Sequence, residues 1–332
     1  MHKALALVLT LPLLANAAEP KATGTLITAN QGPNNLALID LATGKQVGTL
    51  DEQGKIKVHE LAMLPDGKTL IAPIYGNSGV GKPGTDGTEV LVFDVPSRKV
   101  THVIDLGKGL RPHQPTYDPT RNVVYVTTEL QQAMTAIDAK TFKVLYTVPT
   151  GQAESHMFVL SHDGRFGYTA NVGPGTVSVM DMNTHKLVTV IPVAPHLQRI
   201  AISRDDKTVF VSDTTTPRVA AIDTATNKLR SWIDLPSPGF GARATADGKY
   251  LLICMPDASK LGLVDVATMK LVKTIDVAGK PQEILFSPDG SRAWASSFGV
   301  PQVAEIDTES WTLTRELPGT DRNDGMAYTS LH

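Results

Sequence analysis

A repeat of about 42 residues organises this sequence and constrains the fold more than any other feature. One aspartate marks the same point of every unit, and its last four copies are spaced by 42 residues. The seven copies are Asp40, Asp94, Asp138, Asp181, Asp223, Asp265 and Asp307. A period of this length is typical of propellers, solenoids and other repeat arrays, in which each repeat is one small structural unit.

Each unit predicts four short strands, which we name a to d in chain order. Runs rich in Val, Ile, Thr and Tyr are separated by Gly, Pro, Asp and Asn, as strands and turns require. The recurring aspartate ends strand c and precedes a turn such as TATNKL, where its side chain can accept backbone N–H groups. Seven such antiparallel sheets predict an all-β fold, a seven-bladed β-propeller.

The two ends of the repeat region predict how the ring closes. The first unit starts with GTLITAN, which has the character of strand b, so its strand a is missing. Residues 324–330, DGMAYTS, predict a strand a that has no blade of its own. We therefore expect the C-terminal strand to pair with the N-terminal blade, which removes an exposed sheet edge.

The first residues predict a secretory signal. Lys3 precedes an apolar run over residues 4–14, and Ala15-Asn16-Ala17 has the small-x-small pattern of a cleavage site. We expect residues 1–17 to be cleaved, leaving one propeller domain over 18–332 in the periplasm or secreted. No later apolar stretch approaches the roughly 20 residues of a membrane-spanning helix, so no membrane span is predicted.

Composition argues against some classes of partner. The formal net charge of −2 lacks the basic excess of nucleic-acid-binding proteins, and 5% aromatic residues supply few stacking platforms. Cys254 is the only cysteine, so no disulfide forms within the chain, and its apolar surroundings LLICM predict a buried, unreactive thiol.

The repeats resemble the YVTN-type bacterial β-propellers. The matching phrases are NVVYVTTE at 122–129, TVFVSD at 208–213, KTLIAPIY at 68–75 and IDTATNKL at 222–229. The resemblance covers nearly the whole chain after the signal and implies a propeller. Such proteins and their structural relatives include binding proteins, S-layer proteins, lactonases and haem or copper propellers, so the resemblance leaves function open.

In propellers of this kind strand a lines the central channel, and its first residue lies at one mouth. Aligning the units on the Asp-Gly turn that follows strand a gives seven equivalent positions: His59, His113, His156, Gln198, Phe240, Gln282 and Asp324. Three consecutive blades carry histidine there, although the chain has only nine histidines. Duplication of one ancestral repeat could also produce this pattern.

The three histidines form a candidate metal site. Three imidazoles with an open position suit copper or zinc, so His59, His113 and His156 are candidate ligands for either ion. Haem is not implied, because the sequence contains no CxxCH motif. The same side chains could instead satisfy backbone groups at strand ends.

A second interpretation is a pocket for a small polar or anionic ligand. The candidate residues lie at or just before the starts of the inner strands: Glu60, Arg111, Gln114, Gln198, Arg199, Arg243, Gln282, Glu283 and Asp324. Acids, bases and amides in one concavity suit a polar molecule, and arginine suits carboxylate or phosphate. The alternative is that these residues line a water-filled channel and pair with one another.

One unit is longer than the others, because Asp40 and Asp94 are 54 residues apart. The extra residues fall in YGNSGVGKPGTDG, residues 75–87, between strands b and c. Their Gly, Ser and Pro content predicts a flexible surface loop on the same face as the mouth. An insertion of this kind is often functional in repeat proteins, although it can also be merely tolerated.

Three functional hypotheses follow. The first is a monomeric binding or scaffold propeller whose mouth holds a small polar ligand or a protein partner. The second is a copper or zinc carrier or redox enzyme that uses the three histidines. The third is a lactonase-like hydrolase in which His113 or His156 works with Glu60 or Glu283, and an arginine stabilises developing charge. No GxSxG or HExxH motif selects among them.

Overall fold

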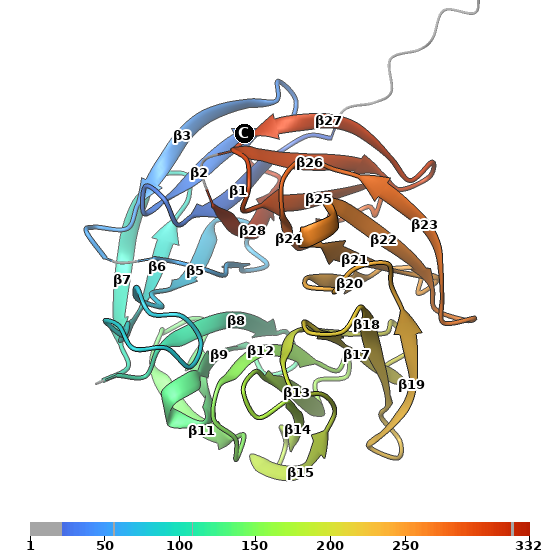
Figure 1. The fold of residues 1–332 in the computed structure, drawn as a ribbon. Helices are drawn as coiled ribbons and strands as arrows, with labels where there is room; N and C mark the ends of the chain where they lie inside the picture. Colours follow the sequence, from blue (N-terminus) through green and yellow to red (C-terminus); the bar gives the residue numbers. More distant parts are fainter. Residues whose placement is uncertain (1–21, 56, 108, 320–321) are drawn as a thin grey trace, which may run out of the picture.

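The computed structural model describes residues 22–55, 57–107, 109–319 and 322–332. Seven four-stranded antiparallel sheets surround a central axis as blades, which confirms the predicted all-β seven-bladed propeller (Figure 1). Within these residues the only helical segments are two 3-10 turns, η1 (Glu129–Gln131) and η2 (Pro256–Ala258). None of the described helices is long and apolar enough to cross a membrane. The predicted signal lies outside the described residues.

Blades 1 to 4 are built in chain order, apart from the closing strand of blade 1. Blade 1 contains β28 (Asn323–Thr329), β1 (Thr25–Asn30), β2 (Asn35–Asp40) and β3 (Lys45–Asp51). Blade 2 contains β4 (Ala62–Met63), β5 (Thr69–Pro73), β6 (Glu89–Asp94) and β7 (Lys99–Asp105). Blade 3 contains β8 (Pro112–Asp118), β9 (Val123–Thr128), β10 (Ala133–Asp138) and β11 (Val144–Pro149). Blade 4 contains β12 (Ser155–Leu160), β13 (Phe166–Asn171), β14 (Thr176–Asp181) and β15 (Lys186–Pro192).

Blades 5 to 7 repeat the same order. Blade 5 contains β16 (Leu197–Ile202), β17 (Thr208–Asp213), β18 (Arg218–Asp223) and β19 (Lys228–Asp234). Blade 6 contains β20 (Ala242–Ala244), β21 (Tyr250–Met255), β22 (Lys260–Asp265) and β23 (Lys270–Asp276). Blade 7 contains β24 (Pro281–Phe286), β25 (Arg292–Ser297), β26 (Gln302–Asp307) and β27 (Thr312–Pro318).

The ring closes through its two chain ends, as predicted. The C-terminal strand β28 pairs antiparallel with β1, with Thr25 opposite Thr329 and Thr28 opposite Met326. Figure 1 shows the red final strand lying beside the blue first blade. The Tyr328 ring also stacks on Trp294 of the neighbouring blade, at 5.9 Å between ring centroids. The last strand therefore joins the first blade to the last one.

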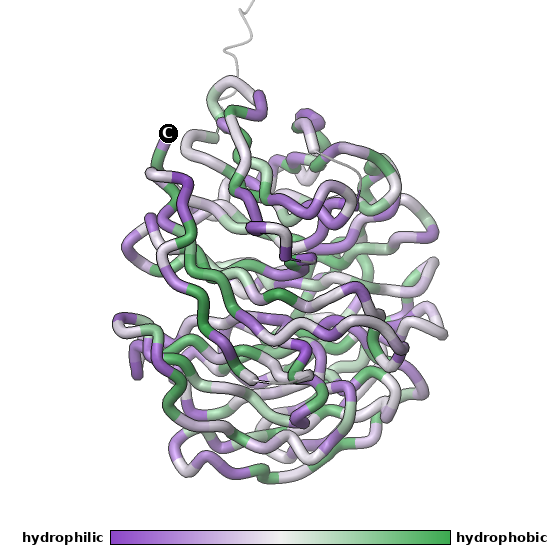
Figure 2. Tube along the Cα trace, turned by 90° about the vertical axis from the view of Figure 1, so that its left-hand side faces the viewer, coloured by the Kyte–Doolittle hydropathy of each residue, from purple (hydrophilic) through white to green (hydrophobic). Residues whose placement is uncertain are grey.

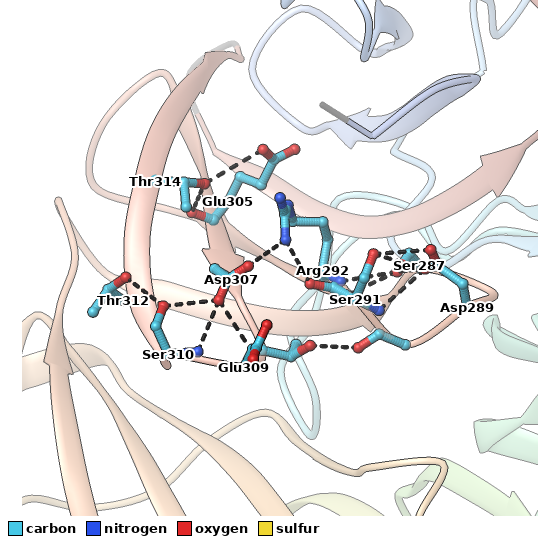
Figure 3. Close-up of polar contacts among 12 residues, drawn as sticks. Ser287, Asp289, Ser291, Arg292, Glu305, Asp307, Glu309, Ser310, Thr312 and Thr314 are labelled. Atoms are coloured by element: carbon cyan, nitrogen blue, oxygen red, sulfur yellow. Dashed lines mark hydrogen bonds and ion pairs between the residues drawn. The ribbon is translucent and has the colours of Figure 1, made fainter. Parts of the chain in front are cut away.

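The recurring aspartates hold the turns between strands c and d. In blade 7, Asp307 Oδ1 accepts the backbone N–H of Ser310 at 2.8 Å and also its hydroxyl at 2.8 Å (Figure 3). Arg292 pairs with the other carboxylate oxygen of Asp307. The other six aspartates accept backbone N–H groups just ahead of them in the same way. The predicted turn role is confirmed in every blade.

Apolar strands packed between neighbouring blades form the core. Strands b and c are buried almost throughout, and Trp294, Tyr125, Phe93 and Phe210 are among the largest fully buried side chains. Hydrophobic stretches along the strands are separated by hydrophilic stretches at many turns (Figure 2). Burying these side chains is the main stabilising contribution, at about 1.5–3 kcal/mol each. Cys254 is buried as predicted, and burial raises the pKa of its thiol.

Candidate functional site

Most inner strands begin with a β-bulge, and the bulges position the candidate site. The strand register shifts between Pro112 and Pro115, Ser155 and Met157, Leu197 and Ile200, and Pro281 and Ile284. The pairing of β28 with β1 contains a similar irregularity. A bulge inserts an extra residue into the ladder and turns its side chain to a new direction. Five of the seven residues predicted at the channel mouth lie in these irregular pairings: His113, His156, Gln198, Gln282 and Asp324.

A cavity of about 180 Å³ lies at this mouth. All seven aligned residues line it: His59, His113, His156, Gln198, Phe240, Gln282 and Asp324. The remaining wall is formed by Gln31, Tyr75, Gly79, Val80, Arg199 and Phe298. The closed ring therefore brings residues that are far apart in sequence to one small polar cavity.

The three histidines lie side by side. The ring centroids of His113 and His156 are 3.8 Å apart in a stacked arrangement, and those of His59 and His113 are 5.3 Å apart. Tyr75 lies against all three, with ring centroids 4.6–5.8 Å away. Burial, followed by the nearby His156, lowers the pKa values of His59 and His113 well below 6.5. Both imidazoles are therefore neutral at pH 7.

Two buried imidazole nitrogens of residues that line this cavity have no hydrogen-bond partner, namely Nε2 of His59 and Nδ1 of His113. A buried polar atom of this kind is costly unless a water or ligand satisfies it. No group of three or more His, Cys, Asp or Glu among the described residues is arranged to hold a metal ion. Stacked rings direct their in-plane lone pairs along parallel planes rather than to one point. The side-chain arrangement therefore gives the predicted copper or zinc site no support.

Glu129 organises one wall of the mouth, although the sequence analysis did not identify it. It follows β9 directly and is 1% exposed. Its carboxylate accepts the Tyr75 hydroxyl at 2.8 Å and an Arg111 N–H at 2.9 Å, and lies 3.3 Å from His156 Nδ1. Burial alone would raise the pKa of Glu129, but His156, Tyr75 and Arg111 outweigh burial and lower it. A carboxylate that is ionised at neutral pH thus orients His156.

Arg111 serves the loop rather than the cavity. Its guanidinium donates to Asp86 at 2.8 Å and to the carbonyl oxygens of Gly79 and Lys82 at 3.2 and 3.1 Å. The loop is also folded back on itself, because the Asn77 N–H donates to the Thr85 carbonyl at 3.0 Å. The structure therefore differs from the predicted flexible loop, since hydrogen bonds anchor residues 75–87 as a wall of the mouth.

A buried ion cluster closes the inner side of the mouth cavity. Arg199 Nη2 lies 2.7 Å from Asp324 Oδ1 and 2.6 Å from Glu60 Oε1, although the Glu60 contact lacks hydrogen-bond geometry. Gln31 donates to the second oxygen of Asp324 at 2.7 Å. Burial opposes the charge of Arg199, but Glu60 and Asp324 outweigh burial and raise its pKa. Burial is also the main cause of the raised pKa values of Glu60 and Asp324.

Two of the predicted ligand residues cap neighbouring strands. Gln114 Oε1 accepts the backbone N–H of Phe158, and Glu283 Oε2 accepts that of Met326, both at 2.6 Å. Glu60 occupies the equivalent strand position, but the equivalent donor residue is Pro115, which has no N–H. This missing donor explains why Glu60 pairs with Arg199.

The predicted ligand residues are therefore divided among three places. The mouth cavity is lined by Gln198, Arg199, Gln282 and Asp324. A second, wider cavity is lined by Glu60, Gln114, Arg243 and Glu283. Arg111 lines neither cavity. The prediction of a single pocket was wrong in this respect, because neighbouring residues of one strand point to different sides.

Several mouth residues were not predicted from the sequence. They are Gln31, Glu129 and Phe298. Tyr75, Gly79 and Val80 belong to the 75–87 loop that was predicted on the mouth face, and Glu129 ends the NVVYVTTE phrase. The repeat pattern carries a signal for the three unpredicted residues, because each directly follows the second strand of its blade: Gln31 follows β1, Glu129 follows β9 and Phe298 follows β25.

Known proteins agree with this architecture. Antigen Lp49 of Leptospira interrogans is 22% identical over 231 residues, which cover 63% of this chain and 50% of that protein. The seven-bladed beta-propeller protein Rv1057 of Mycobacterium tuberculosis is 25% identical over 310 residues, 81% of this chain and 72% of that protein. The chain thus spans half the length of the first relative.

The solved structure of Kuenenia stuttgartiensis hydrazine synthase superposes with a TM-score of 0.73 over 86% of this chain and 92% of that one. At 19% identity this likeness shows the fold alone. The family model described as lactonase, 7-bladed beta-propeller, matches residues 5–238. The narrower YVTN-type assignment stays a prediction. This chain belongs to the lactonase family of seven-bladed β-propellers.

Proposed function

We propose that this protein is an exported binding propeller that holds a small polar molecule in the mouth cavity. The observation that carries this proposal is the pair of unpartnered, neutral imidazole nitrogens of His59 and His113 in a cavity of about 180 Å³. A ligand with hydroxyl or amide groups supplies their missing hydrogen bonds. The side-chain amides of Gln198 and Gln282 supply further donors and acceptors.

The size and chemistry of the cavity favour a compact hydroxylated molecule. Phe240 and Phe298 add apolar wall, and Arg199 is already paired with Asp324, so a strongly anionic ligand has no free cation to meet. Few polar groups precisely placed in a concave site are typical of small-molecule pockets. The predicted class of small polar or anionic ligands is accordingly narrowed to neutral or singly charged ones.

A screen of small hydroxy acids, their lactones and polyols by ligand-observed NMR tests binding. We expect at least one saturable ligand whose binding is lost in Gln198→Trp, which fills the cavity from its half-buried rim. Val272→Trp, on the exposed outer strand β23, is the matched control and should leave binding unchanged. Absence of any ligand, or equal binding by both variants, contradicts the proposal.

Lactone hydrolysis is the second candidate, and the Glu129–His156 pair favours it. If His156 donates its Nδ1–H to Glu129, its Nε2 carries the lone pair and can act as a general base. Water would add to the lactone carbonyl as His156 takes its proton. The ring C–O bond would then break, the leaving oxygen would take that proton, and a hydroxy acid would be released.

Hydrolysis is tested by pH-stat titration with glucono-1,5-lactone, after subtracting the spontaneous rate. We expect His156→Gln to lower kcat/KM by about 100-fold or more, as loss of a general base does. Val272→Trp should hydrolyse the lactone at the wild-type rate. A wild-type rate equal to buffer alone excludes this activity and leaves the binding proposal to its own screen.

Export is part of the first proposal and rests on the signal-like residues 1–17. Intact-mass measurement of the protein made in a bacterial host tests it. We expect a mature chain that starts after Ala17 or Ala18 in the periplasmic fraction. An uncut chain confined to the cytoplasm contradicts export. The predicted monomeric state and protein partner stay predictions.

A further inference from the structure

A second cavity, of about 690 Å³, follows the inner strands away from the mouth. Its lining begins one or two residues after the mouth positions and continues along each inner strand, in four blades into the following turn. We call it the inner funnel. Its volume is well within the usual range of about 300–1,000 Å³ for ligand sites.

Part of the wall of the inner funnel is apolar. Leu61, Met63, Leu160, Ile202, Leu285 and Phe286 line it, and all six are partly exposed. Apolar side chains that remain partly exposed to solvent do not stabilise a water-filled channel. A concave surface with apolar side chains is instead characteristic of a binding site. The wall therefore suits a molecule with an apolar body.

The end of the inner funnel nearest the mouth is acidic. Glu60 and Glu283 line it, and both are buried. Together with Asp324 they face one buried guanidinium, that of Arg199. Arg243 lies 3.6 Å from Glu283, but its side chain is 45% exposed. Three buried carboxyls face one buried cation, and a cationic ligand beside them would favour their ionised forms.

We propose that the inner funnel binds an amphipathic cation, with its ammonium group against Glu60 and Glu283 and its apolar body along the wall. This site is separate from the mouth, because the Arg199 cluster lies between the two cavities. It goes beyond the proposed function and does not depend on it. Buried carboxylates select a cation over an anion of the same shape by charge complementarity.

Fluorescence titration with dansylcadaverine tests the proposal, since this probe joins a primary ammonium to an apolar dye. Dansylglycine carries the same dye on a carboxylate and is the matched control ligand. We expect one saturable site for dansylcadaverine and affinity at least about tenfold weaker for dansylglycine. No saturable binding, or equal binding of the two probes, overturns the proposal.

Two variants locate the binding. Glu283→Gln keeps an acceptor for the Met326 amide and should weaken dansylcadaverine by about tenfold. Ile202→Arg places a charge on the partly exposed wall and should abolish binding, whereas Val272→Arg on the outer strand should not. Each variant is first checked for a native circular dichroism spectrum. Unchanged affinity in Ile202→Arg means that the probe binds elsewhere and overturns the proposal.

Discussion

The mouth cavity and the inner funnel share one channel and seven inner strands but differ in chemistry. The mouth is small, about 180 Å³, and presents imidazoles and amides, whereas the inner funnel is about 690 Å³ with a partly apolar wall and an acidic end. Consecutive residues supply the two sites: His59 faces one and Glu60 the other. The irregular starts of the inner strands therefore allow two consecutive residues to face two different cavities.

Of the substitutions considered, those at the boundary between the two cavities should change the free energy of unfolding most. Arg199→Leu leaves three buried carboxyls without their cation, so we expect the free energy of unfolding to fall by about 3–5 kcal/mol. Arg243→Leu removes a half-exposed arginine and should cost less than about 1 kcal/mol. Urea denaturation of both variants measures this. Equally small losses of unfolding free energy in the two variants would contradict the buried ion cluster that we place around Arg199.

The second largest loss of stability is expected at Glu129, which holds the wall of the mouth. Glu129→Gln keeps the shape but removes the charge that pairs with Arg111 and orients His156. We expect a loss of about 2–3 kcal/mol in the free energy of unfolding, together with weaker ligand binding at the mouth. The exposed Glu316→Gln on β27 is the control, with a change within about 0.5 kcal/mol. A neutral effect of Glu129→Gln would show that the wall is held by other contacts.

The neutral imidazoles predict a pH dependence that distinguishes the mouth from the inner funnel. His59 and His113 have pKa values below 6.5 when folded, so below pH 6.5 the unfolded chain binds more protons. The contribution of each histidine to the free energy of unfolding is complete above pH 6.5. It is lost as pH falls below this value, by at most about 1.4 kcal/mol per pH unit for each histidine.

The carboxyls act in the opposite sense. Glu60, Glu283 and Asp324 have raised pKa values, so the folded state holds their protons more tightly and their contribution is lost as pH rises. Stability curves of wild type and His113→Gln from pH 8 to 5 separate the two effects. We expect the variant to lose less stability on the acid side. Parallel curves would contradict a neutral His113.

The smallest effect is expected at a strand cap. Gln114→Leu leaves the Phe158 N–H without its acceptor and should cost about 1 kcal/mol. Hydrogen exchange measured by NMR should show faster exchange at the Phe158 amide. Gln282→Leu, which removes a mouth amide that caps no neighbouring inner strand, should leave the equivalent Met326 amide protected by Glu283. Unchanged exchange at Phe158 would assign Gln114 to ligand binding instead.

The fold could be predicted from sequence because the repeat is local and periodic. The aspartate turns and the unmatched strand at 324–330 gave the blade number and the ring closure, since each depends on residues close in sequence. The first residues of the inner strands could be predicted for the same reason. The alignment places Glu60 and Glu283 at the mouth because it cannot show to which side of the strand each side chain points.

The remaining site residues depend on contacts between distant parts of the chain. Glu129 meets Tyr75 across 54 positions, and Gln31 meets Asp324 across 293. No local pattern marks such pairs. The effect of Pro115 on Glu60 was likewise hidden, because it requires knowing that these two strands are neighbours in register.

Imidazole nitrogen NMR is the most direct test of the proposed mouth site. Long-range proton–nitrogen spectra report the protonation of each histidine ring and its response to a ligand found in the screen. We predict that His59 and His113 are neutral at pH 7 and become protonated only well below pH 6.5, and that their signals shift on ligand addition. The signals of the exposed His162 should not shift when the ligand is added. Ordinary titration of both rings near pH 6.5, with no shift on ligand addition, would contradict the account.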